Sequence, residues 1–353
     1  MSATCTVRTQ RAPRPPRPSL TPRTPRPPRP PHRSRPLRGW PARRTRQAGL
    51  TIAELLVAMA LGLGVLLGAG TLLVTSTRAH AALVEAAEMD DSGRYAVDAL
   101  ARAVRLASYI DWEHAPLQDP AAPARIVGLD ARSLTRTGAG ITSLAPDVAN
   151  GSDVLAVRFR GSGAPPNGDG ATLDCAGFPV HRDEEGWSIF YVGRNAQGEN
   201  ELRCKYRGAS NWSSDAVAGK VDSFQVLYGL DLDADGAPER YVNAGMVTAL
   251  DAALVPAGAT PEERSADLER RTHWKRVAAV RVALLLYGGH LDAGLGAGIV
   301  HDLFGADYGA RFAAFDAGVR LSESVLAGRA GAYRVRKVVG TTVAVPVAPL
   351  ATE

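Results

Sequence analysis

An acidic run in the middle of the chain offers carboxylate oxygens at a spacing that suits a hard cation. It contains Asp231, Asp233, Asp235 and then Gly236, which matches the start of a DxDxDG calcium loop. The twelfth position of such a loop normally supplies a bidentate glutamate. Here that position is Val242, so Glu239 would have to contribute instead. Because Asp and Gly also favour tight turns, an acidic hairpin turn without a metal is the alternative.

Cysteine spacing indicates a disulfide rather than a metal site. Neither Cys175 nor Cys204 has a second Cys or a His two to four residues away, so the pair matches no zinc pattern. In an oxidising compartment we expect the two to pair, which would constrain the unfolded chain by about 3 kcal/mol. Two free buried thiols are the alternative. Cys5 lies in the N-terminal tract and is left out of this pairing.

The other residue types that catalyse reactions form no recognisable site in the sequence. No serine lies in a nucleophile elbow, and the glycine-rich stretches 161–163 and 294–298 lack the Lys-Ser/Thr pair that grips a phosphate. We therefore predict that the protein is not an enzyme, with no catalytic residues and no cofactor apart from the calcium considered above. The histidines contain no pair at metal-ligand spacing and are expected at the surface: His32, His80, His114, His181, His273, His290 and His301.

Glu54 is the only charged residue in an apolar stretch, 50–77. At about 1.5 Å per residue, a helix over this stretch can cross a bilayer of about 30 Å. A carboxylate inside such a span costs about 3 kcal/mol, so we expect it to have a specific role. Arg43, Arg44 and Arg46 stand directly before the span, and the positive-inside rule then places the rest of the chain outside the cytoplasm.

The positive formal charge of the chain, +5, comes from its N-terminal tract. Residues 1–48 contain 13 Arg, 12 of the 24 Pro and no acidic side chain, which leaves −8 on the remainder. Such a tract is expected to be disordered or polyproline-like. It is either a long basic leader or the product of a start codon placed too far upstream. The acidic remainder argues against nucleic acid as a partner of the body, because phosphate binding needs a basic face.

The pattern of apolar residues predicts one long helix followed by a β-rich head, an α+β fold with the helix packed on an antiparallel sheet. The helix has a membrane-spanning half, 50–77, and an amphipathic half, 78–110, which we expect to dock on the head, 111–353. A Gly- and Ala-rich insertion around 288–332 fits no element. Strands are expected at 154–159, 187–192, 201–206, 221–230, 277–287 and 333–345.

The start of the helix resembles the class III signal of type IV prepilins. That signal is a basic leader ending in Gly, followed by an apolar helix with Thr second and Glu fifth. Gly49, Thr51 and Glu54 stand at those places, and Leu50 replaces the commoner Phe. The resemblance implies a leader, 1–49, that is cleaved after Gly49, and an N-methylated Leu50. Glu54 of a neighbouring subunit would pair with the new α-amine and set the register between helices, and Thr51 belongs to the same assembly motif.

Three segments of the head resemble the PilW family of minor pilins: 221–236, 274–285 and 333–344. The resemblance implies a subunit that starts or tips a type IV pilus, in motility, adhesion or DNA uptake. Its partners would be the prepilin peptidase, other minor pilins, the major pilin and a tip adhesin. The chain would cross the inner membrane once, with a periplasmic head, before it enters the fibre at the cell surface.

Two other interpretations remain open on the sequence. A minor pseudopilin of a type II secretion system would share the helix and the cleavage signal. A membrane-anchored extracytoplasmic binding protein or adhesin would keep the span but never enter a fibre. Cleavage after Gly49 would separate the two kinds of fibre subunit from the plain anchor.

Overall fold

The computed structural model describes residues 49–107, 109, 119–208 and 210–345, so the predicted leader, 1–48, lies outside the described residues. The chain divides into two compact units, Met1–Val65 and Leu66–Glu353. The expected α+β class is confirmed. A long apolar N-terminal helix, α1 (Ile52–Leu106), is followed by antiparallel sheets.

Within the second unit, the C-terminal part of α1 forms one wall of the core. Ala96, Leu100 and Val104 recur once per turn and are fully buried, in a cluster shared with apolar residues of both larger sheets. Gly93 lies so close to the strands that a Cβ atom there would be 3.0 Å from Cδ1 of Leu286. Small residues on this stripe therefore let the helix backbone approach the sheet.

Docking of the amphipathic half starts later than the sequence predicts. Residues 78–88 are all exposed, although Leu83 and Val84 are apolar, and the first buried side chain of α1 is Met89. Lys337 forms an ion pair with Asp90 beside this first buried turn. The periodicity predicts an apolar face correctly, but the strands of the head meet that face only from Met89 onward.

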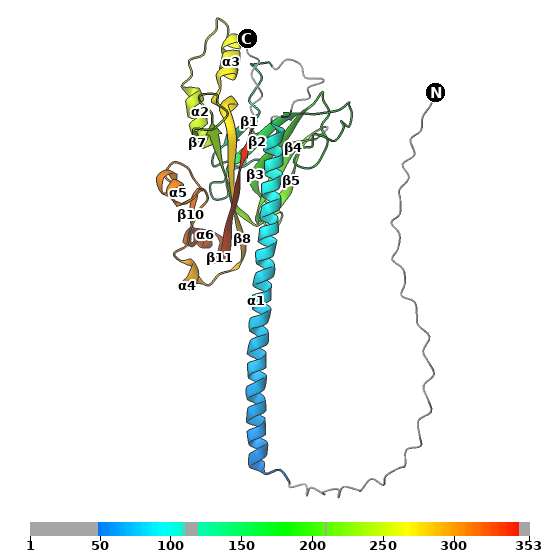
Figure 1. Ribbon diagram of the computed structural model, residues 1–353, viewed down its shortest axis with the longest axis vertical. Coiled ribbons are helices and arrows are strands. Elements are labelled where there is room, and N and C mark those ends of the chain that lie inside the picture. The colour runs from blue at the N-terminus through cyan, green and yellow to red at the C-terminus, as the bar shows by residue number, and fades with distance from the viewer. Residues whose placement is uncertain (1–48, 108, 110–118, 209, 346–353) are drawn as a thin grey trace, which may run out of the picture. The chain divides into compact units, whose positions relative to one another are not determined.

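The larger sheet is a five-stranded antiparallel meander, in which each strand pairs with the next along the chain. Figure 1 shows these strands beside the C-terminal part of α1. The predicted ranges for its second, third and fourth strands are correct to within two residues, whereas the first and the last were not predicted. The strands are β1 (Ile126–Leu129), β2 (Val154–Arg160), β3 (Glu185–Arg194), β4 (Asn200–Arg207) and β5 (Trp212–Gly219).

The second sheet has the order β11-β8-β6-β7 and is also antiparallel. Strand β6 occupies the predicted range, and both of its faces are buried. Ser223 and Gln225, on the polar face, are as fully buried as Phe224 on the other. Its strands are β6 (Val221–Leu230), β7 (Arg240–Val242), β8 (Val277–His290) and β11 (Arg334–Ala344).

The insertion around 288–332 explains why both faces are buried. Its apolar residues form a second core with Leu227, Ala283 and Leu285, on the face of β6 and β8 opposite to the main core. Arg336 of β11 pairs with Asp222 and with Glu323 of the insertion, and all three side chains are buried or nearly so. The insertion comprises α4 (Ala293–Gly296), β9 (Val300–Asp302), α5 (Ala306–Phe312), β10 (Arg320–Ser322) and α6 (Glu323–Ala330).

Two helices and a 3-10 turn that were not predicted from the sequence separate β7 from β8. They are α2 (Ala244–Ala252), α3 (Pro261–Arg271) and η1 (His273–Arg276). The signal for α3 was present, because Thr260 and Glu263 form a capping box and Pro261 stands in the first turn. The residues of α3 are mostly charged and none of its side chains is buried, so it lacks the apolar content by which helices are usually found.

The buried stripe of α1 predicts a large difference between two identical substitutions. Leu100→Ala removes a fully buried side chain and should lower the free energy of unfolding by about 3 kcal/mol. Leu83→Ala, on the same helix, removes a side chain that is 70% exposed and should change it by less than about 0.5 kcal/mol. Denaturant unfolding of the detergent-solubilised chains measures both, and equal losses would contradict the described docking.

Candidate functional site

The predicted cleavage position lies in an accessible, non-helical segment ahead of α1. Gly49 and Leu50 are exposed, and nothing lies within 4 Å of the place where a Cβ atom of Gly49 would stand. The helix begins only at Ile52. The Gly49–Leu50 peptide bond therefore lies outside the hydrogen-bonded turns of α1.

Glu54 has a hydrogen-bond partner within its own chain, Thr51, in addition to the partner predicted from a neighbouring subunit. Its Oε2 accepts hydrogen bonds from the backbone N–H of Thr51 at 2.9 Å and from the Thr51 hydroxyl at 3.1 Å. The Glu54 N–H donates in return to the hydroxyl of Thr51 at 3.2 Å. This reciprocal pair is a capping box, and its signal was the T-x-x-E spacing at the helix start. The expected pairing with a neighbour's α-amine stays a prediction, and Oε1 has no partner among the described residues.

The first part of α1 exposes an apolar surface of the kind that lipid or other helices cover. Side chains such as Leu61, Leu66 and Leu72 are each about two-thirds exposed or more. By length and composition, α1 can cross a membrane, and none of its most apolar 18-residue window is buried within the chain. Apolar surface this extensive is typical of membrane or protein contacts.

The acidic loop between β6 and β7 is brought together as the sequence predicts. Ligand atoms of Asp231, Asp233, Asp235 and Glu239 lie within 4.8 Å of one another. Asp231 is buried and already accepts hydrogen bonds from the N–H groups of Ala234, at 2.6 Å, and Gly236, at 2.9 Å. Glu239 accepts one from Leu232. The loop is therefore stabilised by its own backbone, while its carboxylates keep lone pairs that could bind a cation.

A calcium titration separates the two interpretations of this loop. If it binds calcium, the missing twelfth ligand limits the affinity to a Kd of about 10⁻⁴ to 10⁻³ M. Asp233→Asn, which removes an exposed carboxylate of the cluster, should then weaken binding by at least about tenfold, the equivalent of about 1.4 kcal/mol. Asp183→Asn, at an exposed acid outside the loop, should not. If the wild-type titration shows no heat, the calcium interpretation is rejected and the loop is an acidic hairpin turn without a metal.

Cys175 and Cys204 form a disulfide in the structure, with their Cα atoms 5.9 Å apart. Cys204 lies in β4 and is buried in the main core, whereas Cys175 lies in the loop between β2 and β3. Phe178, three residues after Cys175, packs against Tyr206 of β4, with ring centroids 5.3 Å apart. The disulfide thus ties a long loop to the central part of the five-stranded sheet.

Two histidines differ from the surface residues that the sequence predicts. Nδ1 of His273 lies 2.7 Å from a carboxylate oxygen of Asp251, and Nε2 of His301 lies 3.1 Å from one of Glu323. Both imidazoles are partly buried. The Thr272 hydroxyl donates to Asp251 rather than to the imidazole, so this group lacks the nucleophile-to-base hydrogen bond of a catalytic triad.

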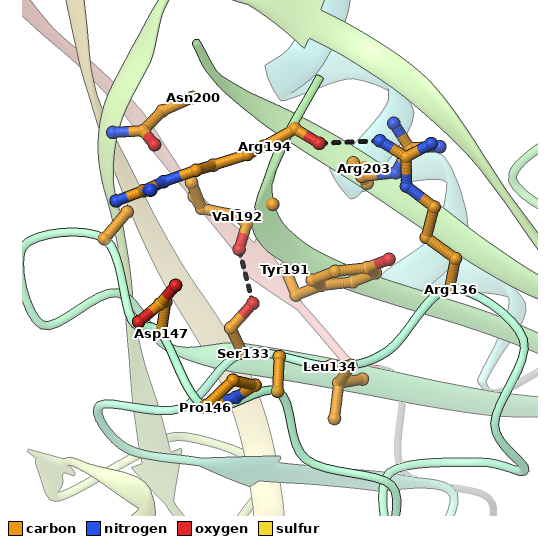
Figure 2. A pocket seen from close by; sticks show the side chains of 13 residues that line it. Ser133, Leu134, Arg136, Pro146, Asp147, Tyr191, Val192, Arg194, Asn200 and Arg203 are labelled. Carbon is orange, nitrogen blue, oxygen red and sulfur yellow. Dashed lines mark hydrogen bonds between the residues drawn. The ribbon is translucent and has the colours of Figure 1, made fainter. Parts of the chain in front are cut away.

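One cavity of about 170 Å³ opens beside β3 and the loop that precedes β2. Figure 2 shows that Arg136 donates to the backbone carbonyl of Arg194 and Ser133 to that of Val192. The guanidinium of Arg203 is paired with Glu201. The polar side chains that line the cavity are therefore largely hydrogen-bonded or ion-paired within the chain. Among the described residues, those that line it do not pair a nucleophile with a base.

Comparison with known proteins gives one match. Residues 189–346 match the family model described as PilW, type IV Pilus-assembly protein W. The matched range runs from β3 to the end of β11 and includes the three segments on which the sequence resemblance rests. Residues 49–54 lie outside it. No curated protein and no solved structure matches the chain.

Proposed function

Because residues 189–346 match the family model of PilW, type IV pilus-assembly protein W, we propose that this chain belongs to that family and is a minor pilin. In this proposal it is cut after Gly49 and enters the fibre through α1. One observation carries the proposal. The chain that contains the matched region, residues 189–346, also contains a helix whose apolar side chains are exposed from its start up to Met89.

The local structure at the helix start supports processing and assembly. The Gly49–Leu50 bond is exposed, and cleavage there would leave a positive α-amine four residues ahead of Glu54. Thr51 engages only Oε2 of Glu54 among the described residues, so Oε1 can accept from the amine of a neighbouring subunit. A charge-assisted hydrogen bond of this kind in apolar surroundings is strong and sets the register of two helices.

The proposal places the chain in the inner membrane, with its head in the periplasm, until a pilus takes it up. Its partners there are the prepilin peptidase, other minor pilins, the major pilin and a tip adhesin. The disulfide between Cys175 and Cys204 suits an oxidising compartment outside the cytoplasm. The family match favours pilus assembly over the related pseudopilin role in type II secretion.

Processing is tested by a bulky residue at the cleavage position. Gly49→Val should leave the uncleaved chain in the membrane, because a branched side chain blocks the peptidase at the residue it must accommodate. Intact-mass spectrometry of the membrane fraction measures the fraction cleaved. Gly62→Val, the same substitution inside the helix, should be processed normally. Normal cleavage of the Gly49 variant would contradict the assigned cleavage position.

Assembly is tested separately by removing the charge of Glu54. Glu54→Gln keeps the capping box, since Gln also serves at the third helical position, but loses the attraction for a neighbour's amine. We expect normal cleavage and about tenfold less protein in sheared fibres, the equivalent of about 1.4 kcal/mol. Glu85→Gln, at an exposed position of the same helix, is the control. Wild-type amounts of the Glu54 variant in fibres would rule out the proposed pairing.

A further inference from the structure

A second cavity, of about 200 Å³, lies where the insertion 288–332 meets α2 and the end of β1. The insertion contributes aromatic side chains and one acid, α2 contributes its first turns, and a second acid follows β1. These elements are far apart in the sequence, so only the folded head creates the cavity. Its lining includes Asp130, Asn243, Tyr308, Phe312, Phe315 and Asp316.

Aromatic rings form one side of this cavity. The rings of Tyr308 and Phe312 have centroids 4.6 Å apart, and Phe304 packs behind Tyr308 at 5.6 Å. Phe315, by contrast, is 85% exposed. Because Phe315 lines the cavity and its ring is exposed, the face of the ring is accessible to a ligand. Aromatic faces carry negative charge density and attract cations.

Three acids lie in or close behind the wall of this cavity. Asp130 accepts hydrogen bonds from the N–H groups of Ala244 and Gly245 at the start of α2. Asp153 lies behind it, fully buried, and accepts from the backbone of Ala131 and Val226. The third acid, Asp316, comes from the insertion. None of the three has a Lys, Arg or His nitrogen within 4.0 Å among the described residues.

Asp316 is the acid that most needs a partner. It is only 3% exposed, and its Oδ2 accepts a hydrogen bond from the Tyr308 hydroxyl at 2.9 Å. Its Oδ1 is buried without a hydrogen-bond partner of standard geometry in the described structure, although the side chain of Asn243 lies close enough to lower the pKa of Asp316. A buried carboxylate oxygen without a donor is costly, so a donor from outside the chain would be strongly favoured here.

The titration behaviour of the acids agrees with an uncompensated cluster. Burial raises the pKa of Asp316 and of Asp130, although hydrogen bonds oppose the shift at both. The pKa of Asp153 is raised further, by its burial and by the charges of Asp130 and Asp316. A cation bound among these groups would favour their ionised forms.

We propose that this cavity binds the guanidinium group of an arginine side chain presented by a partner polypeptide. The planar cation stacks on the exposed ring of Phe315 and donates hydrogen bonds to Asp130, with the carboxylate of Asp316 in the wall beside it. Arginine suits the site better than a compact ammonium because its fork of donors can bind a carboxylate while its plane covers a ring. Arg311, whose guanidinium lies 5.2 Å from the centroid of Phe312, shows the same stacking on an exposed face of α5.

Two other occupants fit the geometry less well. A metal ion needs ligand atoms gathered tightly around it, and among the described residues only the Asp231 loop brings three acids within 4.8 Å of one another. A sugar would also stack on an aromatic ring, but it would bring no charge to balance the acids. The negative charge of the three acids therefore favours a cation over a sugar.

The test uses the detergent-solubilised full chain and two small probes of the same shape. N-acetyl-arginine methylamide should bind weakly but saturably in an NMR titration, and the neutral citrulline analogue should bind at least about tenfold more weakly, since it lacks the charge. The lysine analogue and a methyl glycoside complete the set. Equal binding of arginine and citrulline probes, or preference for the glycoside, would overturn the proposal.

Variants locate the binding. Asp316→Asn should weaken the arginine probe about tenfold, whereas Asp307→Asn, at an exposed acid of α5 outside the cavity, should not. Phe315→Ala removes an exposed ring and leaves the core intact, so it remains informative if Asp316→Asn fails to fold. Unchanged affinity in Phe315→Ala would disprove the site. Cleavage after Gly49 is measured in the same samples. It tests the proposed function independently, because it should not depend on whether the cavity binds a probe.

Discussion

The contact between the small-residue stripe of α1 and the strands is the constraint on which the second unit depends. Gly93, Ala96 and their neighbours let the helix backbone lie close to β8 and β11, and Leu100 and Val104 fill the space between the sheets. A protein interior tolerates few voids, so each larger residue on this stripe would displace strands. The same helix carries the uncovered apolar segment, which means that one element links the folded core to the assembly function proposed for the chain.

Much of this architecture could be predicted from the sequence because its signals are local. The uninterrupted apolar run gives α1, and β6 coincides with its predicted range because alternation marks it clearly. The elements that were missed carry weak local signals: β1 has four residues, β7 has three, and α3 buries no side chain. Burial of Ser223 and Gln225 could not be predicted, because it depends on the insertion folding over their face of the sheet.

The candidate sites show the same division between local and distant signals. The Asp231 loop and the Thr51–Glu54 capping box are encoded within nine residues or fewer, and their spacing alone shows them, although the capping box was overlooked. The cavity between the insertion and α2 draws Asp130, Asn243 and Asp316 from three separate parts of the chain. No spacing rule connects them, and the Gly- and Ala-rich composition of the insertion hides its contribution. Sites of this kind are found only when the fold is known.

The capping box at the start of α1 also affects how Glu54 tolerates an apolar environment. The first turn of a helix carries a partial positive charge, and the carboxylate of Glu54 is folded back onto it by the two bonds from Thr51. Its negative charge is therefore partly neutralised by its own helix before any other chain arrives. In a bilayer, the hydrogen bonds from Thr51 would stabilise the Glu54 carboxylate before the subunit is assembled. A neighbouring chain would then need to supply only the remaining part of the stabilisation of that charge.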